Sequence, residues 1–246
     1  MKLITLTILI LLCLSSCNHR SRVDITPHRV NPEADVFYQQ ARVLHSNRGD
    51  IESTLQVLAL LDKALHIDSL NPHYYGLKAR VLIEMGLLNP ALDIQTHADK
   101  LGAINGDYLF QLGLLQAARG MEEEARRSFR RSDEFMTEVL RRYPDSLVAF
   151  VTQQAAYALY MGNDSLYMPD HRYVFDRFPD RAWDLEMTRR LRPSNLVREL
   201  LDLEERRTAM EENLKSSLSE LWESLETGTE RPVWMEYLEN LPQNLE

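Results

Sequence analysis

The chain has little of what flexible, collagen-like or β-rich proteins need. Its 246 residues include only 9 glycines and 10 prolines, and no long linker-like tract interrupts them. Alternating runs rich in Val, Ile and Thr are scarce, which argues against β-sheets. Leu, Ala, Glu, Arg and Met dominate after residue 33, and these residues favour helices. With 44% hydrophobic and 26% charged residues, the composition predicts a folded, all-α protein.

The sequence motifs that usually accompany catalysis or metal binding are also missing. The seven histidines form no HExxH or His-x-x-x-His pair. No GxGxxG, GxxxxGK[ST] or GxSxG motif occurs. The run Glu122-Glu123-Glu124 suits the amino end of a helix, where the helix dipole favours negative charge, better than a catalytic pair. We therefore expect no enzyme, no catalytic or metal-binding residues and no cofactor.

Net positive charge is absent too, which argues against a nucleic-acid partner. The chain carries a formal charge of −9 and has a pI near 5.3. Its arginine-rich stretch, Asp107 to Arg142, holds seven arginines but also seven acidic residues. This balance predicts a solvated, ion-paired helix face. The acid excess lies at the carboxyl end, where thirteen Asp and Glu face five Lys and Arg from Arg198 onward.

The first seventeen residues have the pattern of an export signal. A positive start, Met1-Lys2, precedes an almost unbroken apolar run of twelve residues from Leu3 to Leu14. A membrane-spanning helix needs about twenty residues, so the run is too short to cross a bilayer and fits a signal-peptide core. It ends in Leu14-Ser15-Ser16-Cys17, which resembles the lipobox of bacterial lipoproteins. The alternatives are an ordinary secretory signal with a chance cysteine, or a short anchor.

The resemblance to lipoproteins implies a location and removes cysteine chemistry. Residues 1–16 would be cleaved, Cys17 would carry the lipid, and residues 17–32 would form a flexible tether. Cys13 would be lost with the signal, and no disulfide or metal-thiolate site would remain. Because Asn18 rather than Asp follows the cysteine, the sorting rule of Gram-negative lipoproteins favours the outer membrane. The stretch Asn18 to Arg22 has no acidic run of the kind some bacteria use to export lipoproteins to the cell surface, which favours the side facing the periplasm.

Two stretches in the middle of the chain align without gaps at a spacing of 34 residues, 72–105 and 106–139. Each has a large residue, then a small one, a glycine and two further small residues at matching positions: Tyr75 and Leu109, Ala79 and Gly113, Gly86 and Gly120, Ala91 and Ala125, Ala98 and Ser132. This pattern resembles the tetratricopeptide repeat. In that family two helices meet at the small residues, and the glycine ends the first helix in a left-handed conformation.

The resemblance predicts a right-handed superhelix of about four helix-turn-helix units over residues 33–178. A first helix around Phe37 and Ala41 would pair with a second helix over Ile51 to Ile67, and residues 47–50 would be absorbed in the turn. In the fourth unit, Val148 to Gly162 would be the first helix and His171 to Phe178 the second.

The remaining segment, 179–246, is predicted to be a helical extension. Leucines recur at a mostly 4-3 spacing in a long helix over Asn195 to Leu225, with Arg207 interrupting the pattern. This helix either caps the last exposed apolar face of the repeats, forms a homodimer through 195–225, or projects toward a partner.

In tetratricopeptide proteins, five positions on each first helix line a concave binding groove. Carried onto this chain, these positions give candidate groove residues and no catalytic ones: Tyr38, Arg42, His45, His73, Arg80, Glu84, Asp107, Phe110, Leu114 and Tyr160. Asp35, Ile83, Ala117, Thr152, Ala156 and Leu159 also fall at these positions. The Lys and Asn that clamp a carboxylate in the chaperone-binding members are absent. The groove would be apolar in its third and fourth units, where either a partner peptide or the chain's own C-terminal helix would lie.

These features favour a lipid-anchored scaffold or adaptor that binds a protein or peptide partner in the cell envelope. One alternative is a lipoprotein that binds glycan or peptide substrates, which would need exposed aromatics such as Tyr38, Tyr74, Tyr75 and Tyr160. Another is an inhibitor or immunity-type protein whose acidic carboxyl end masks a basic partner.

Overall fold

The computed structural model describes residues 29–46, 51–168, 175–181 and 192–224, with side chains described up to residue 209 of the last segment. Within these ranges every regular element is a helix, which confirms the all-α prediction. The expected cleavage site, Cys17 and most of the expected tether lie outside the described residues.

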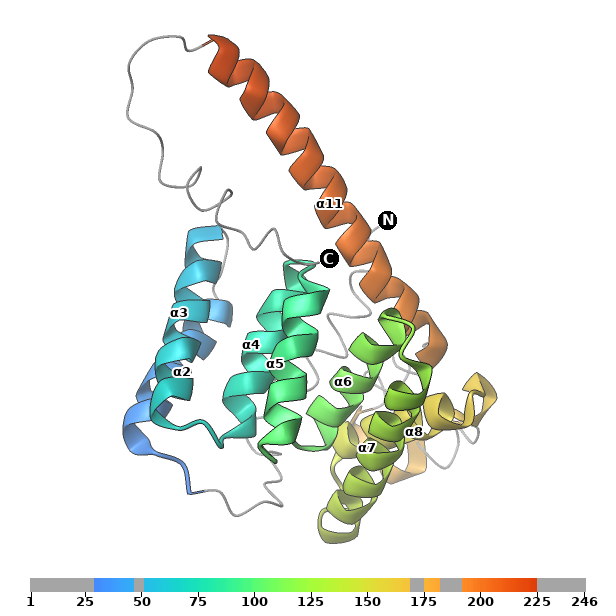
Figure 1. Ribbon diagram of the computed structural model, residues 1–246. Coiled ribbons are helices and arrows are strands. Elements are labelled where there is room, and N and C mark those ends of the chain that lie inside the picture. The colour runs from blue at the N-terminus through green and yellow to red at the C-terminus, as the bar shows by residue number, and fades with distance from the viewer. Residues whose placement is uncertain (1–28, 47–50, 169–174, 182–191, 225–246) are drawn as a thin grey trace.

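The helices follow one another as adjacent packed pairs. They are α2 (Pro32–Ser46), α3 (Ile51–Ile67), α4 (Pro72–Glu84), α5 (Leu88–Lys100), α6 (Gly106–Ala118), α7 (Glu122–Arg142) and α8 (Leu147–Met161). Two short 3-10 turns, η1 (Asp164–Leu166) and η2 (Pro179–Arg181), precede the long helix α11 (Pro193–Ser224). Helix α2 packs on α3, α4 on α5, and α6 on α7, while α8 packs on α7 (Figure 1). The bounds of α3 match the predicted second helix of the first unit.

Side-chain caps set where the first helices of the later pairs begin. Asn71 accepts a hydrogen bond from the His73 amide at 3.0 Å, and Pro72 opens α4 where no amide donor is needed. Asn105 caps α6 through the Tyr108 amide at 3.1 Å. Ser146 caps α8 in the same way. Asn and Ser are favoured here because their side-chain oxygens satisfy amides that the helix leaves without a partner.

Glycines end or follow the same helices in a left-handed backbone conformation. The φ angles are +72° at Gly86, +70° at Gly120 and +66° at Gly162. Only glycine adopts this conformation without steric cost, so each of these helices stops at a defined place. The predicted role of Gly86 and Gly120 as helix-ending glycines is confirmed.

Small residues lie where paired helices approach most closely. Ala79, Ala91, Ala98 and Ala125 are all buried. Ser132 is also buried, and its hydroxyl donates to the Gly106 carbonyl at 2.7 Å, which joins α7 to the start of α6. A Cβ atom on Gly113 would come within 2.6 Å of the Phe129 ring of α7. The small residues that match between the two stretches therefore lie in the helix-pair core.

Gly113→Ala should destabilise the protein although alanine favours helices. The added Cβ atom would overlap the buried Phe129 ring, and overpacking of this kind costs about 1–3 kcal/mol. Urea unfolding followed by circular dichroism measures the loss. Adding Phe129→Leu should remove much of the extra cost of Gly113→Ala. Gly102→Ala is the control, because its left-handed turn has open space around it and its cost should not depend on residue 129. Strictly additive effects of the Gly113 and Phe129 changes would contradict this packing.

The arginines of α7 are held by ion pairs along the helix surface, as the charge balance predicts. Arg127 pairs with Glu124, Arg130 with Glu134, and both Arg141 and Arg142 with Glu138. Arg131 reaches Asp99 on α5 through two hydrogen bonds of 2.8 Å. The acidic run Glu122–Glu124 forms the first turn of α7. These pairs leave no uncompensated basic stripe on the described surface of α7.

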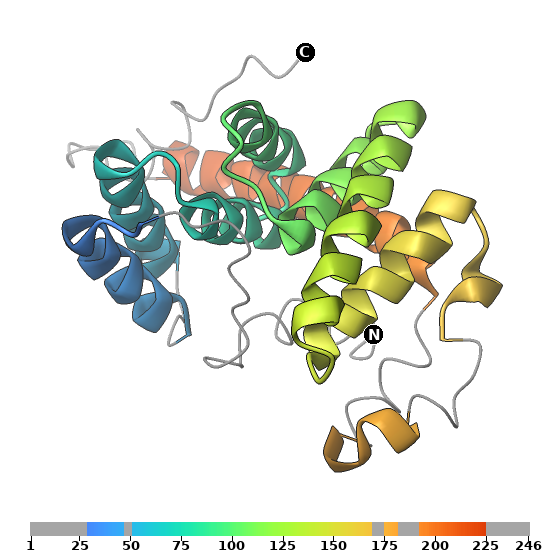
Figure 2. The same ribbon diagram turned by 90° about the horizontal axis from the view of Figure 1, so that it is seen from below.

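The fourth helix pair is described only in part. Helix α8 coincides closely with the predicted first helix, but residues 171–174 of the predicted second helix lie outside the described residues. Phe178 is buried, and its ring centroid lies 5.4 Å from that of Phe150. Helix α11 then returns across α8, α6 and α4, and its carboxyl-terminal part extends beyond the ends of α4 and α5 (Figures 1 and 2).

Candidate functional site

The candidate binding residues come from α2, α4, α6 and α8, the first helices of the successive pairs. We call the side of these helices that carries them the first-helix face. Contacts run from each helix to the next. His45 of α2 lies 3.9 Å from Glu84 of α4, and His73 of α4 shares a 3.3 Å hydrogen bond with the Tyr108 hydroxyl of α6. The fold thus brings side chains from successive first helices into one row.

Asp107 lies at the polar centre of this row. Its carboxylate accepts a hydrogen bond of 3.1 Å from the Thr152 hydroxyl of α8 and lies within electrostatic reach of Arg80 on α4. Part of Asp107 still meets solvent, but burial of the carboxylate raises its pKa. The Thr152 hydrogen bond and the positive charge of Arg80 oppose that shift without cancelling it. Three first helices therefore meet at a carboxylate whose charged form is disfavoured.

Three of the candidate groove residues, Tyr38, Arg80 and Phe110, offer almost no surface to a ligand, which corrects the prediction; Arg80 is only 9% exposed. Tyr38 is only 3% exposed, and its ring centroid lies 5.0 Å from that of Tyr74 in the core between α2, α3 and α4. Phe110 is buried against Phe129. The groove positions of the family indicate on which helix turn a residue lies. They do not set where its side chain points, and the large rings at these positions pack into the nearest core. Arg42 instead keeps a partly exposed guanidinium beside the Tyr38 ring.

The exposed aromatic cluster that a glycan-binding protein would need is not formed by the named tyrosines. Tyr38, Tyr74 and Tyr75 are all buried. Tyr160 is half-buried, and the Arg126 guanidinium lies over its ring at 5.6 Å. Sugar stacking requires open ring faces, so these four residues do not provide such a surface.

The apolar part of the first-helix face is covered by α11. Leu196 belongs to the core cluster of Phe150 and Val151, against which Leu114 and Tyr160 also pack. Leu200 belongs to the neighbouring cluster, whose other members include Ile83, Leu88 and Leu115, and Leu203 packs against that cluster. Leu114 contributes to both clusters. Of the two occupants considered for this region, the structure contains the chain's own helix.

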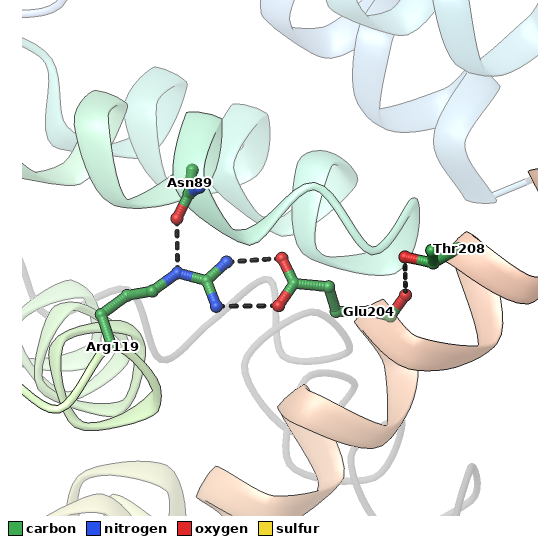
Figure 3. Close-up of polar contacts among 4 residues, drawn as sticks. All are labelled: Asn89, Arg119, Glu204 and Thr208. Carbon is green, nitrogen blue, oxygen red and sulfur yellow. Dashed lines mark hydrogen bonds and ion pairs between the residues drawn. The ribbon is translucent and has the colours of Figure 1, made fainter. Parts of the chain in front are cut away.

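A polar clamp at the end of α6 holds the next turn of α11. Arg119 follows the last residue of α6 and caps the carboxyl end of that helix. Its guanidinium donates from Nη1 to one carboxylate oxygen of Glu204 at 2.8 Å and from Nη2 to the other (Figure 3). Its Nε donates to the side chain of Asn89 at the start of α5. The side chains of Arg119 and Glu204 are 22% and 29% exposed, so water has limited access to the pair. A bidentate arginine–carboxylate pair also fixes orientation.

Gly86 and Asp164 hold α11 at two further points. A Cβ atom on Gly86 would lie 2.8 Å from Cβ of Arg207 and 3.1 Å from the Leu203 carbonyl oxygen, so α11 passes directly over this turn. At the other end, Asp164 accepts hydrogen bonds from the amide and hydroxyl of Ser194 at the start of α11. The docked segment therefore runs from Ser194 to Arg207.

Sequence reasoning did not identify Arg119, Glu204 or the second role of Gly86. Arg119 and Glu204 are 85 residues apart, and no local pattern relates them. The presence of glycine at position 86 was already explained by its left-handed turn, so its contact with α11 left no separate signal in the sequence. A usable signal existed only for the leucines at 196, 200 and 203, whose spacing predicts an apolar helix face.

The described residues contain no group of three or more histidine, cysteine, aspartate or glutamate side chains placed to hold a metal ion. Among the same residues, no helix is both long and apolar enough to cross a membrane. No family model, curated protein or solved structure matches the chain. The arrangement offers a helix-binding surface with an arginine clamp and a row of polar contacts beside it.

Asp107→Asn should make the protein more stable at neutral pH. A carboxyl with a raised pKa in the folded state imposes no cost below its unfolded value near 3.8, and the cost grows as pH rises through the folded value. The amide variant lacks this titration and can still accept the Thr152 hydrogen bond. Thermal unfolding at pH 3.5 and pH 7.5 should show its advantage only at the higher pH. Asp145→Asn, at an exposed carboxylate, is the control. An equal difference at both pH values would contradict the assignment.

Proposed function

We propose that this protein is a lipid-anchored scaffold that binds a protein partner through its first-helix face and performs no catalysis. The observation that carries the proposal is the apolar strip and arginine clamp on α4, α6 and α8, where the amino-terminal part of an amphipathic helix, α11, already lies. Helix-in-groove contacts of this kind are a common mode of peptide recognition.

We further propose that the helix pairs form a tetratricopeptide-like superhelix. Three features support this architecture: the adjacent pairing of the helices, the left-handed glycines that follow the first helices, and the buried small residues at matched positions. In such an array, the side chains of successive first helices form one continuous surface. The contacts from His45 to Glu84 and from Asp107 to Thr152 agree with that arrangement.

The lipid anchor is proposed from the sequence alone. The apolar run, the two small residues and Cys17 place a lipidated cysteine before a short tether, and Asn18 favours the outer membrane, facing the periplasm. A single tethered attachment would hold the first-helix face near the membrane without embedding it. The partner is then expected among envelope proteins.

Cys17→Ala should release the chain from membranes and abolish its labelling by a radioactive fatty acid. The thioether that would carry the lipid cannot form without this sulfur. Membrane fractionation and labelling in a bacterial host measure both effects. Cys13→Ala is the matched control, because it removes the other thiol of the chain and should leave lipidation intact. Persistent labelling of the Cys17 variant would refute the anchor.

The binding function is tested by site-specific photocrosslinking in intact membranes. A photoreactive residue replaces Arg42, on the polar part of the first-helix face, or Arg127, on the outer surface of α7, where the side chain is 65% exposed. A partner on the first-helix face should crosslink at position 42 and not at 127. Absence of any protein adduct at position 42, together with binding of a glycan or small peptide, would replace the scaffold proposal with a substrate-binding one.

A further inference from the structure

Helix α11 displays the chemistry that its docking surface recognises. Its contacts come from Leu196, Leu200 and Leu203, which follow one another at four and three residues, and from Glu204 directly after them. Residues at this spacing share one side of a helix. The surface beneath them would keep its apolar strip, the Arg119 clamp and the Gly86 turn if α11 left.

One residue on the docked side of α11 works against docking. Glu199 lies three residues after Leu196 and four before Leu203, so it shares their side of the helix. It is only 9% exposed, and its Oε2 atom is buried with no hydrogen-bond partner among the described residues. Burial raises the pKa of this carboxyl, and the negative charge of Asp202 raises it further, against the opposing charge of Arg198. A buried acceptor without a partner is costly, because water satisfies it fully when the helix is released.

The surroundings of Glu199 do not remove that cost. Among the helices that α11 packs against, α8 carries no charged residue. Helix α4 carries Arg80 and Glu84 on its first-helix face, and the positive charge of one balances the negative charge of the other. On α6, Asp107 is itself acidic. Arg119, at the end of α6, is engaged by Glu204 and Asn89. No described side chain therefore neutralises Glu199 through a direct bond.

We propose that α11 is a releasable occupant of this surface, and that the partner supplies a helix with leucines at i, i+4 and i+7 and a carboxylate at i+8. The proposal rests on the proposed function and specifies its ligand. A partner helix with an apolar or small residue at i+3 makes the same contacts as α11 without the Glu199 penalty. Such a helix can displace α11, whereas one lacking the carboxylate leaves Arg119 without its partner.

The probe is a fluorescent peptide with the sequence of α11, residues 193–224, titrated into the full chain and followed by anisotropy. In the wild-type chain, its own α11 competes and binding should be weak. Glu204→Arg places a like charge against Arg119 and weakens the docking of α11, so the peptide should bind this variant about tenfold more tightly. Glu205→Arg is the matched control, because this exposed neighbour makes no described contact with the surface and should leave binding unchanged.

Charge exchange tests whether the peptide occupies the α11 position. A peptide carrying E204R should not bind the Glu204→Arg chain, but it should bind an Arg119→Glu chain, where the clamp has the opposite sign. Binding that ignores the charge at position 119 would mean that copies of α11 associate with each other, and it would overturn the proposal. Failure of the wild-type peptide to bind the Glu204→Arg chain, with that chain folded by circular dichroism, would overturn it as well.

Glu199→Gln tests the releasable character of α11. The neutral side chain should strengthen docking within the chain and weaken peptide binding several-fold relative to wild type. Unchanged or tighter peptide binding would contradict the role of Glu199.

The outcomes also separate this proposal from the proposed function. If envelope partners crosslink equally to the wild-type and Glu204→Arg chains, binding stands and release of α11 fails. If the peptide binds as expected but no partner is captured, the docking chemistry stands and the scaffold function fails.

Discussion

A row of helix pairs buries only the apolar surface that a neighbouring element covers, and this constraint shapes the whole molecule. Within each pair, small residues such as Ala79, Gly113 and Ser132 let the two helices approach closely. Between pairs, Tyr108 lies across Gly76 and joins α6 to α4. Among the described helices, no further pair covers the first-helix face of α4, α6 and α8. Helix α11 covers that face with leucines and so takes the place of an external element.

The cover provided by α11 combines strong and weak contacts. Leu196 and Leu200 are buried in two core clusters, and burial of a leucine side chain contributes roughly 1.5–3 kcal/mol. The Arg119–Glu204 pair sets the register of the helix on the surface (Figure 3). Glu199 opposes docking because its buried Oε2 atom has no hydrogen-bond partner in the described part of the chain. A helix held in this balance suits a surface that exchanges one helix for another.

Local patterns in the sequence predicted much of the fold for identifiable reasons. The repeat pattern located α3 and α8, because it depends on residues within a few turns of each other. The left-handed glycines followed from backbone sterics alone. Equal numbers of arginines and acids predicted the ion-paired surface of α7, since side chains three or four apart on a helix meet.

The candidate site was predicted less completely, because its decisive contacts join residues far apart in the chain. The groove positions of the tetratricopeptide family selected Asp107 and Leu114. They did not show that Thr152 would donate a hydrogen bond to Asp107, or that α11 would pack near Leu114. Tyr38 and Phe110 were placed in the groove, yet both are in the core because tertiary packing draws large rings inward. Burial of Glu199 was also unforeseen, since an isolated glutamate in an acidic helix usually faces solvent.

Helix α11 lies across the first-helix face and is held there by Arg119 and Glu204. A double-mutant cycle tests this docking most directly, with Arg119→Ala, Glu204→Ala and the double variant compared with wild type. Hydrogen exchange of the backbone amides from residues 196 to 207 reports the free energy of α11 release in each chain. We expect a coupling of about 1 kcal/mol between the two substitutions, because the two side chains form a partly exposed bidentate pair. A coupling of zero, with the two single effects simply adding, would contradict this mode of docking.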